Sequence, residues 1–324
     1  DYTGGGCPHI LSEPQRTNLF PYSEDFSQTD WVKNNQTLSL STVLSPNGTT
    51  FSYKATATAD NSKMTDTLSL LGTTTYTVSF YANNISGVDP QILVWDNDNS
   101  AVLLSQSYGS ELISDEWVRI VGSFTTTTAA SVQLQVTRNL DDTEEMLIWG
   151  AQIEAGSYAT SYIPTSGTSV TRNQDLFSRD GIGSLIGSEG VFYAEFKVLH
   201  NYLQQSISIS DGTINTRVLM YVTSGGAIRG QIKGSATVGV NDASGATATD
   251  FNKVAIRYKD NQVDLSVNGA TIVTNTTTNT SPTTLNELSF TAGAAGSGAF
   301  EGQIRSIQVY DTALTDVQLT SLTS

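Results

Sequence analysis

Two runs of acidic side chains are the first places where this sequence could do chemistry. Asp96 and Asp98 follow Trp95, and the second run is DDTEE at residues 141–145. Residues two apart on a strand point to the same side, so Asp96 and Asp98 can converge like the paired carboxylates of a glycosidase. The same oxygens suit calcium, which prefers several hard oxygen ligands. A third interpretation, which we favour, is that both runs are hydrophilic loops between strands.

Other catalytic patterns are missing from the sequence. It contains no phosphate-binding glycine loop, no nucleophile elbow and no His-Glu-x-x-His motif. The chain has two histidines, His9 and His200, and a single cysteine, Cys7. No local pattern supports a Ser/His/Asp set around His200. We therefore name no catalytic residue and predict a protein that is not an enzyme and needs no cofactor.

Glycan binding needs an exposed aromatic ring beside planar polar side chains. Of the four tryptophans, Trp95 is the one surrounded by Asp and Asn, which makes it the best platform in the first half. Its candidate partners there are Asp96, Asp98, Tyr108, Arg138 and Asn139, provided that they share one face. In the second half the polar and aromatic candidates are Tyr202, Arg217 and Tyr221, with Arg229. The alternative is that these are ordinary strand-face residues.

The charge of the chain excludes several partners. Its 324 residues carry 31 acids and 16 bases, a net charge of −15. Nucleic acids and anionic membrane surfaces are bound mainly through Lys and Arg, so we expect neither as a partner. The acidity is uneven: residues 1–165 carry 18 acids and 6 bases, whereas 166–324 carry 13 and 10. No apolar run is long enough to span a membrane, so we expect no membrane insertion.

Strand patterns dominate the chain. Residues 76–81, 132–136 and 263–267 alternate between apolar and polar side chains and are bounded by Gly, Asn, Asp and Ser. Many short strands of this kind predict an all-β fold of two antiparallel β-sandwich (jelly-roll) domains in tandem. One short C-terminal helix is expected around Leu314–Leu319, capped by a Thr or an Asp.

Composition places the domain boundary in a Gly- and Ser-rich stretch. We expect an extended lead-in at 1–13, a first domain at 14–163, a connector at 164–187 and a second domain at 188–324. The chain opens at Asp1 without an initiator methionine, so we also expect further structure upstream.

Two long motifs bracket the first half. The first is EPQRTNL at Glu13–Leu19, and the second is WGAQIEAGSYATSYIPT at Trp149–Thr165. Together they resemble the carbohydrate-binding-like jelly roll of tailed-bacteriophage head-spike, head-fibre and tail-fibre proteins. The second half is similar to concanavalin-like and laminin-G-like sandwiches, through GVFYAEF at Gly190–Phe196, VAIRY at Val254–Tyr258 and FEGQIRSIQVY at Phe300–Tyr310.

The resemblance implies a role at the virion surface. It suggests a head or tail fibre protein that mediates adsorption to host-surface glycans, forms a homotrimer and is joined upstream to other virion proteins. Related jelly rolls often hold a structural calcium, which here would implicate Asn18, Glu24, Asp25 or Glu154. Three alternatives stay open: a polysaccharide depolymerase component, a carbohydrate-binding module of a secreted bacterial enzyme, and a purely structural virion decoration.

Overall fold

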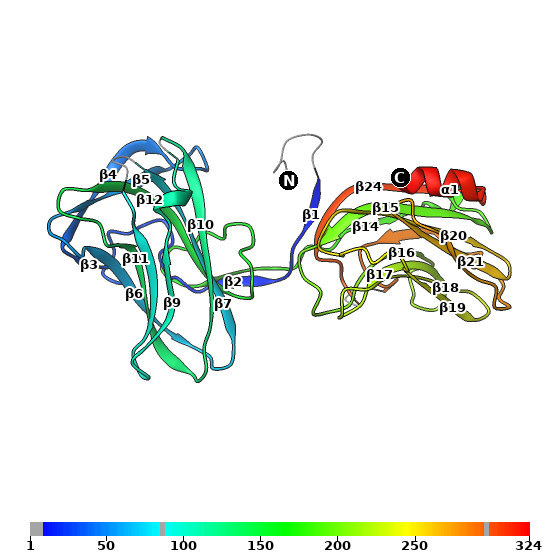
Figure 1. Ribbon diagram of the computed structural model, residues 1–324, viewed down its shortest axis with the longest axis horizontal. Helices are drawn as coiled ribbons and strands as arrows, with labels where there is room; N and C mark the ends of the chain where they lie inside the picture. Colours follow the sequence, from blue (N-terminus) through cyan, green and yellow to red (C-terminus); the bar gives the residue numbers. More distant parts are fainter. Residues whose placement is uncertain (1–8, 85–87, 114, 295–297) are drawn as a thin grey trace. The chain divides into compact units, whose positions relative to one another are not determined.

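The computed structural model describes residues 9–84, 88–113, 115–294 and 298–324, which form two compact units (Figure 1). Sandwich I is Gln15–Asn173, and sandwich II is Gln174–Ser324 together with the start of the chain as far as Pro14. Each unit stacks antiparallel sheets, and the described residues contain a single α-helix, at the C-terminal end. The predicted all-β fold class, with two antiparallel sandwiches and one short C-terminal helix, is confirmed.

Sandwich I contains two five-stranded sheets. In order across the sheet, sheet Ia has β10 (Trp117–Thr125), β7 (Thr75–Asn84), β12 (Glu145–Ala155), β5 (Phe51–Ala57) and β4 (Gln36–Leu44). Sheet Ib has β3 (Val32–Asn34), β6 (Lys63–Leu70), β11 (Ala130–Arg138), β8 (Gln91–Asp96) and β9 (Ala101–Ser107). A separate pair joins β2 (Arg16–Asn18) to β13 (Val170–Arg172), and the short 3₁₀ helix η1 is Gly109–Glu111.

Sandwich II contains two six-stranded sheets. Sheet IIa has β1 (Ile10–Ser12), β24 (Gly302–Tyr310), β15 (Gly190–Val198), β20 (Asn252–Lys259), β21 (Gln262–Val267) and β22 (Val273–Asn275). Sheet IIb has β14 (Ser178–Asp180), β23 (Glu287–Ser289), β16 (Gln205–Ser210), β17 (Arg217–Val222), β18 (Ile228–Lys233) and β19 (Thr237–Asn241). The 3₁₀ helix η2 is Gly183–Leu185.

The C-terminal helix α1 (Asp316–Thr323) is capped by Thr315, as the sequence predicts. The Thr315 side chain accepts the Gln318 N–H, and the Gln318 side chain accepts the Thr315 N–H, which forms a capping box. The helix lies along the outside of sheet IIa (Figure 1), where Leu319 packs into a small apolar cluster with Val191 and Tyr193. Among the described residues, no helix has the length and apolar character needed to cross a membrane.

The expected lead-in and the expected connector both contain strands that pair within one of the two units. Ile10–Ser12 pairs with β24 and is therefore an edge strand of sandwich II, while residues 1–8 lie outside the described part. Within the expected connector, β13 pairs with β2 in sandwich I and β14 pairs with β23 in sandwich II. Pairing satisfies backbone groups that an extended linker would leave to water. In sequence, sandwich I is thus inserted between the first strand of sandwich II and the rest of it.

Asn18 forms the first part of a buried polar clasp in sandwich I. Its amide nitrogen donates to the carbonyls of Ala151 (3.1 Å) and Ile163 (2.9 Å). Its Oδ1 accepts the N–H groups of Phe20 and Ile153, each at 3.2 Å. One side chain from the first bracketing motif therefore satisfies backbone groups of the second.

Glu154 forms the second part of the clasp and is 0% exposed. Its Oε1 accepts the Thr160 N–H (2.8 Å) and the Gln152 amide (2.6 Å), and its Oε2 accepts the Thr160 hydroxyl (2.7 Å). The Nε of Arg16 lies 3.7 Å from Oε2. We call Arg16, Asn18, Gln152, Glu154 and Thr160 the polar clasp. It joins segments that are about 140 residues apart in the chain, such as Asn18 and Ile163, which lie 145 apart.

Replacing Glu154 by Ala should strongly destabilise sandwich I. The change removes the carboxylate that pairs with the Arg16 guanidinium and leaves the Gln152 amide and the Thr160 N–H buried without their acceptor. Breaking a buried ion pair in this way costs about 3–5 kcal/mol. Urea denaturation, followed by tryptophan fluorescence, measures the loss. Glu116→Ala, which removes an exposed carboxylate from the same unit, should change the free energy of unfolding little; equal losses in both variants would contradict the role of the clasp.

A second buried carboxylate, that of Asp66, has fewer hydrogen-bond donors around it than Glu154 has. Asp66 pairs across β6 and β11 with the core residue Leu134, so its side chain faces the core, where it is 5% exposed. Its Oδ1 accepts the Thr67 N–H at 2.6 Å, whereas its Oδ2 has no hydrogen-bond partner. Burial raises the pKa of Asp66 to about 6, opposed by the Thr67 hydrogen bond and reinforced by Asp30.

The raised pKa of Asp66 predicts a stability that depends on pH. Folded Asp66 holds its proton between about pH 4 and 6, where the unfolded side chain has lost it, so the free energy of unfolding falls as pH rises through that window. We expect Asp66→Asn to raise stability above pH 6 by roughly 2–3 kcal/mol and to flatten the pH dependence between pH 4 and 6. Thermal melts across pH test this, with Asp142→Asn as the exposed control. The prediction would be contradicted if the melting temperature of Asp66→Asn depended on pH in the same way as that of the unmodified chain.

Candidate functional site

Strand β8 directs Trp95 outward from sandwich I. Ile92 and Val94 of this strand are buried in the core, so the alternate residues Gln91, Leu93 and Trp95 point away from it. Trp95 is half-buried and pairs in register with Gln133 of β11 and with Val102 of β9. The indole therefore lies on the outer face of sheet Ib, near the end of β8 and beside the edge strand β9.

Planar amides and hydroxyls lie beside this indole. The Gln135 amide nitrogen donates to Gln133 Oε1 at 2.8 Å. The Oε1 of Gln135 is buried and has no hydrogen-bond partner among the described atoms. Across from these glutamines, Thr67 pairs with Gln133 and Thr65 pairs with Gln135 on β6. The arrangement combines an aromatic ring with a buried acceptor that has no hydrogen-bond partner among the described atoms.

The structure brings Arg138 onto the same face as Trp95. A bulge in β11 lies between Gln135 and Arg138, and Arg138 resumes the register opposite Gln91, whose Oε1 accepts from its Nη1 at 2.7 Å. Asn139 follows as an exposed residue in the left-handed region, with φ of 70°. Asn139 is thus at the turn that ends β11.

We call this surface the Trp95 face; its members are Gln91, Leu93, Trp95, Val102, Gln133, Gln135, Arg138, Thr65 and Thr67. In the described strands of sheet Ib no carboxylate shares this face, although the first 165 residues carry 18 acids against 6 bases. Asp89, which accepts the Ser107 hydroxyl, lies just past its end. The sequence analysis named Trp95 and Arg138 and missed the other members, of which Gln133 and Gln135 bear most on ligand binding. Their alternation in VQLQV was visible, but their place beside Trp95 depends on the pairing of β8 with β11.

Asp96 does not join Trp95 on this face, which corrects the expectation for that residue, whereas Asp98 is exposed in the turn after β8 and its contact with a glycan stays a prediction. Asp96 is 1% exposed and caps the turn after β8, accepting the N–H groups of Asp98 (3.0 Å) and Asn99 (2.9 Å) and the Asn99 amide (2.8 Å). These bonds from Asn99 lower the pKa of Asp96. Asp98 accepts the Ser131 N–H at 2.8 Å. The pair therefore holds a turn between strands, and it does not converge as an acid and a base would.

Tyr108 is likewise corrected from a surface residue to a core residue. It is 0% exposed and meets Phe80 edge-to-face, with ring centroids 5.5 Å apart. Its hydroxyl lies 3.8 Å from the sulfur of Met146. Burial raises the pKa of this hydroxyl, and no saccharide can reach the ring.

The four expected calcium ligands are each engaged by protein groups. Asn18 and Glu154 belong to the polar clasp, and Glu24 accepts the Tyr162 hydroxyl at 3.2 Å. Asp25 accepts from Ser27, Gln28 and Tyr53; burial alone would raise its pKa, but these hydrogen bonds hold that pKa at about 2. Among the described residues, no three His, Cys, Asp or Glu side chains gather in a group that could hold a metal ion. Calcium binding at this end of sandwich I stays a prediction.

The candidates in sandwich II separate into two places. Arg217 and Tyr221 lie on the outer face of β17, because Val218, Met220 and Val222 point into the core. Arg229 of β18 pairs with Tyr221 and shares that face. Tyr202 is in the loop before β16, where it is 51% exposed and stacks on His200 at 3.8 Å between ring centroids.

His200 is part of a buried hydrogen-bonded group. Its Nε2 lies 2.6 Å from Glu301 Oε2, and its Nδ1 lies 3.3 Å from the Gln205 amide nitrogen. An amide at Nδ1 cannot serve as a nucleophile, whereas a catalytic triad requires a hydroxyl or thiol beside the imidazole. The group ties the loop after β15 to the start of β24.

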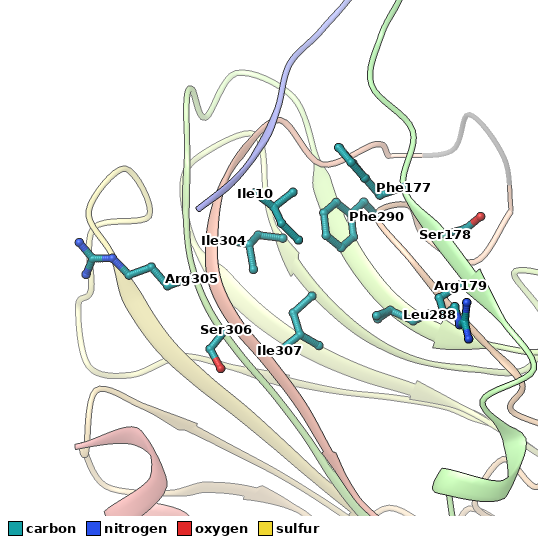
Figure 2. Close-up of a pocket in the computed structure, with 10 residues that line it drawn as sticks. All are labelled: Ile10, Phe177, Ser178, Arg179, Leu288, Phe290, Ile304, Arg305, Ser306 and Ile307. Carbon is teal, nitrogen blue, oxygen red and sulfur yellow. The ribbon is translucent and has the colours of Figure 1, made fainter. Parts of the chain in front are cut away.

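Figure 2 shows an apolar cleft of about 390 Å³ in sandwich II, between the edges of its two sheets. Ile304 and Ile307 of β24 face Leu288 of β23 and Phe290 just beyond that strand, and Arg305 reaches away from the cleft. A saccharide here would bury hydroxyl groups against hydrocarbon at a cost of several kcal/mol. We therefore do not place a glycan in this cleft.

A second hollow, of about 690 Å³, lies on the outer face of sheet Ia. Its lining includes Leu40, Val43, Asn83 and the Lys54–Glu145 ion pair, whose atoms are 2.8 Å apart. The Glu145 carboxylate also accepts the Thr56 hydroxyl, and these two hydrogen bonds help to lower its pKa. The charged groups are therefore matched within the protein, unlike the acceptor of Gln135.

Comparison with known proteins gives a family for part of sandwich II. Residues 192–320 match the family model described as the concanavalin A-like lectin/glucanases superfamily. This agrees with the concanavalin-like and laminin-G-like resemblance of the second half. No curated protein matches the sequence of the chain.

Similar solved structures include carbohydrate-binding modules. The CBM40 module of a Ruminococcus gnavus IT-sialidase, bound to α2,3-sialyllactose, is 20% identical over 44% of this chain and 85% of its own, with a TM-score of 0.38. The CBM22-1 xylan-binding domain of Paenibacillus barcinonensis Xyn10C is 14% identical over 44% and 94%, with a TM-score of 0.34. Domains LG4-5 of the mouse laminin α1 chain are 9% identical over 94% and 92%, with a TM-score of 0.31. At these values the comparison transfers no ligand to this chain.

Proposed function

We propose that this chain is a glycan-binding protein of a tailed-phage virion surface, without a catalytic role, and that the Trp95 face contacts a neutral saccharide. The observation that carries the proposal is the half-buried indole beside two glutamines, one of which has a buried acceptor without a partner. Adsorption to the host would follow from such contacts repeated over many copies.

The Trp95 face suits a saccharide on physical grounds. One side of a sugar ring presents C–H groups, which pack on an aromatic face, while its hydroxyls donate and accept hydrogen bonds. Gln133 is partly exposed and Thr67 is exposed in the same rows of the sheet, and the buried Oε1 of Gln135 can accept a hydroxyl once the neighbouring side chains move aside. A ligand hydroxyl would satisfy an acceptor that the protein leaves unpaired.

The family comparison supports glycan binding at the level of the fold of sandwich II, because a lectin/glucanase superfamily model covers residues 192–320. The virion assignment rests on the two bracketing motifs that form the polar clasp. A glycosidase role is less well supported, because Asp96 and Asp98 are both engaged in a turn.

Replacing Trp95 by Ala should weaken saccharide binding at least about tenfold, since stacking on an aromatic ring contributes on the order of 1–2 kcal/mol. The melting temperature should change little because the ring lies on the outer face of the sheet. A glycan array identifies ligands for the unmodified chain, and calorimetry compares Kd values. Val121→Ala, an exposed apolar change on sheet Ia, is the matched control. Unchanged binding, or a collapsed melting curve, would contradict the assignment.

A second variant separates function from stability. Gln135→Met removes the unpartnered acceptor at similar volume, so we expect stability to be equal or higher while saccharide affinity falls. Release of reducing ends from a bound polysaccharide would instead favour the depolymerase alternative. A folded chain that binds nothing on the array would favour structural decoration.

We also propose that the chain works as a homotrimer on the virion. Three copies would multiply a weak glycan contact, and they would cover sheet edges such as β4, whose nine residues carry no charge. Light scattering after size exclusion should give three times the mass of one chain. A monomer at all concentrations would favour a binding module of a secreted enzyme.

A further inference from the structure

A cluster of cationic side chains occupies the outer face of β17 and β18 in sandwich II. Register pairs Arg217 with Lys233, Leu219 with Gln231, and Tyr221 with Arg229. Residues paired in this way share one side of the sheet, so Arg217, Tyr221, Arg229, Gln231 and Lys233 form one surface, which we call the Arg face. None of these residues belongs to the Trp95 face.

The cations of the Arg face lack acidic partners. The ion pairs seen in the described part of sandwich II are His200–Glu301, Arg257 with Asp264 and Asp316, and Arg305–Glu195. Lys233 donates only to the Asn215 side chain, at 3.1 Å. In a chain with a net charge of −15, three cations without a carboxylate partner form an unusual local environment.

Arg217 is held in a fixed orientation. Its Nη1 donates to the Ala292 carbonyl at 2.5 Å, and its Nη2 donates to Gln231 Oε1 at 2.9 Å. Its Nε is buried and has no partner. Burial lowers the pKa of this guanidinium, which shows that water solvates it incompletely.

Arg229 is the less restrained of the two arginines. Within the described residues it makes no hydrogen bond or ion pair, and its Nε is buried without a partner. A cation removed from water without a counter-ion is destabilising, and an anionic ligand would offset that cost. Two unpartnered guanidinium N–H groups on one face therefore point to an anion.

Two acids lie in the same row of the sheet as Arg217, beyond the edge of the Arg face. Glu287 of β23 and Asp180 of β14 share a row with Arg217, but Ser210 of β16 lies between Glu287 and Arg217. Burial and the neighbouring Asp180 raise the pKa of Glu287. We therefore expect an anionic ligand to bind over β17 and β18 and not over Asp180 and Glu287 on β14 and β23.

We propose that the Arg face binds an acidic oligosaccharide, with sulfate or carboxylate groups on the arginines and one sugar ring against Tyr221. Four residues separate Arg217 from Tyr221 on one strand, roughly 13 Å, and Arg229 pairs with Tyr221. One small anion cannot reach both guanidinium groups, whereas a chain with repeated acidic groups can. Nucleic acid also has repeated charges, but the Arg face has one aromatic residue, Tyr221, and no row of aromatic side chains on which successive bases would stack. This site is independent of the Trp95 face and takes a different class of ligand.

The experiment uses the full chain with defined polymer probes. Dextran sulfate and polygalacturonate supply sulfate and carboxylate, and dextran is the neutral control, each measured by biolayer interferometry at low and high salt. We expect one or both acidic polymers to bind, more weakly at high salt, and Arg229→Gln to leave any binding of neutral dextran unchanged. Arg229→Gln should weaken binding at least about tenfold, because hydrogen bonds to a charged group contribute more than neutral ones. Arg229→Lys should retain more affinity than Arg229→Gln.

Matched variants make the result decisive. Arg179→Gln removes the same charge from an exposed residue that forms no ion pair, and it should leave binding unchanged. Trp95→Ala should also leave the binding of acidic polymers unchanged. The result for the Arg face is therefore independent of whether the Trp95 face binds a neutral saccharide. Equal losses in Arg179→Gln and Arg229→Gln, loss of dextran binding in Arg229→Gln, no binding of either acidic polymer, or equally tight binding of single-stranded DNA would each overturn the proposal.

Discussion

Strand register is the physical constraint on which both candidate surfaces depend. Each strand must keep its apolar side chains on the core, so its polar side chains are forced onto the other side of the sheet. The register between neighbours then decides which of these polar side chains meet. Trp95 lies beside Gln133 only because β8 and β11 pair as they do, and Arg229 lies beside Tyr221 for the same reason in sandwich II. A slip of one residue in β8 would bring Gln91, Leu93 and Trp95 into the core.

The polar clasp explains why the two bracketing motifs are long and polar yet buried. Asn18, Gln152 and Glu154 satisfy backbone groups where β2 meets β12 and the segment up to Ile163, so hydrogen bonds close the sandwich where strand ladders end. Such side chains stabilise the fold only as a complete set, since each would otherwise leave a partner buried and unpaired. The motifs that carry the phage-fibre resemblance are therefore structural residues. In our proposal the ligand contacts the strands between them, since a binding site can be carried by a fold whose other residues are structural.

The two faces differ in electrostatics although both belong to one acidic chain. The Trp95 face offers an aromatic ring, amides and hydroxyls, whereas the Arg face offers three cations without carboxylate partners. An acidic molecule approaches an acidic glycan unfavourably unless cations are concentrated locally. A chain with both surfaces could therefore contact neutral and acidic parts of one host polysaccharide. Repetition over copies would make two weak contacts effective.

Local sequence patterns determined the architecture, the helix cap and the best aromatic candidate. Period-two alternation is a property of a few neighbouring residues, so the strands, the all-β class and the outward position of Trp95 could be predicted from the sequence. Arg217 and Tyr221 could be assigned to one face in the same way, because they lie four residues apart on one strand. The bounds of the two units were harder to predict from the sequence, because Ile10–Ser12 joins sandwich II by pairing with β24, almost 300 residues later in the chain.

Only the tertiary structure decided the composition of the sites. Asp96 and Asp98 look like ligands in the sequence, yet their oxygens accept N–H groups from their own turn and from Ser131. Tyr108 follows a strand and looks exposed, but Phe80 and Met146 enclose it in the core. The sequence around Gln133 and Gln135 shows that they alternate with apolar residues, but it does not show that they lie beside Trp95. That neighbour belongs to a strand some 40 residues away in the chain. The physical reason is general: alternation is encoded locally, whereas side chains that touch a ligand are brought together by non-local pairing and by burial, which depend on the whole fold.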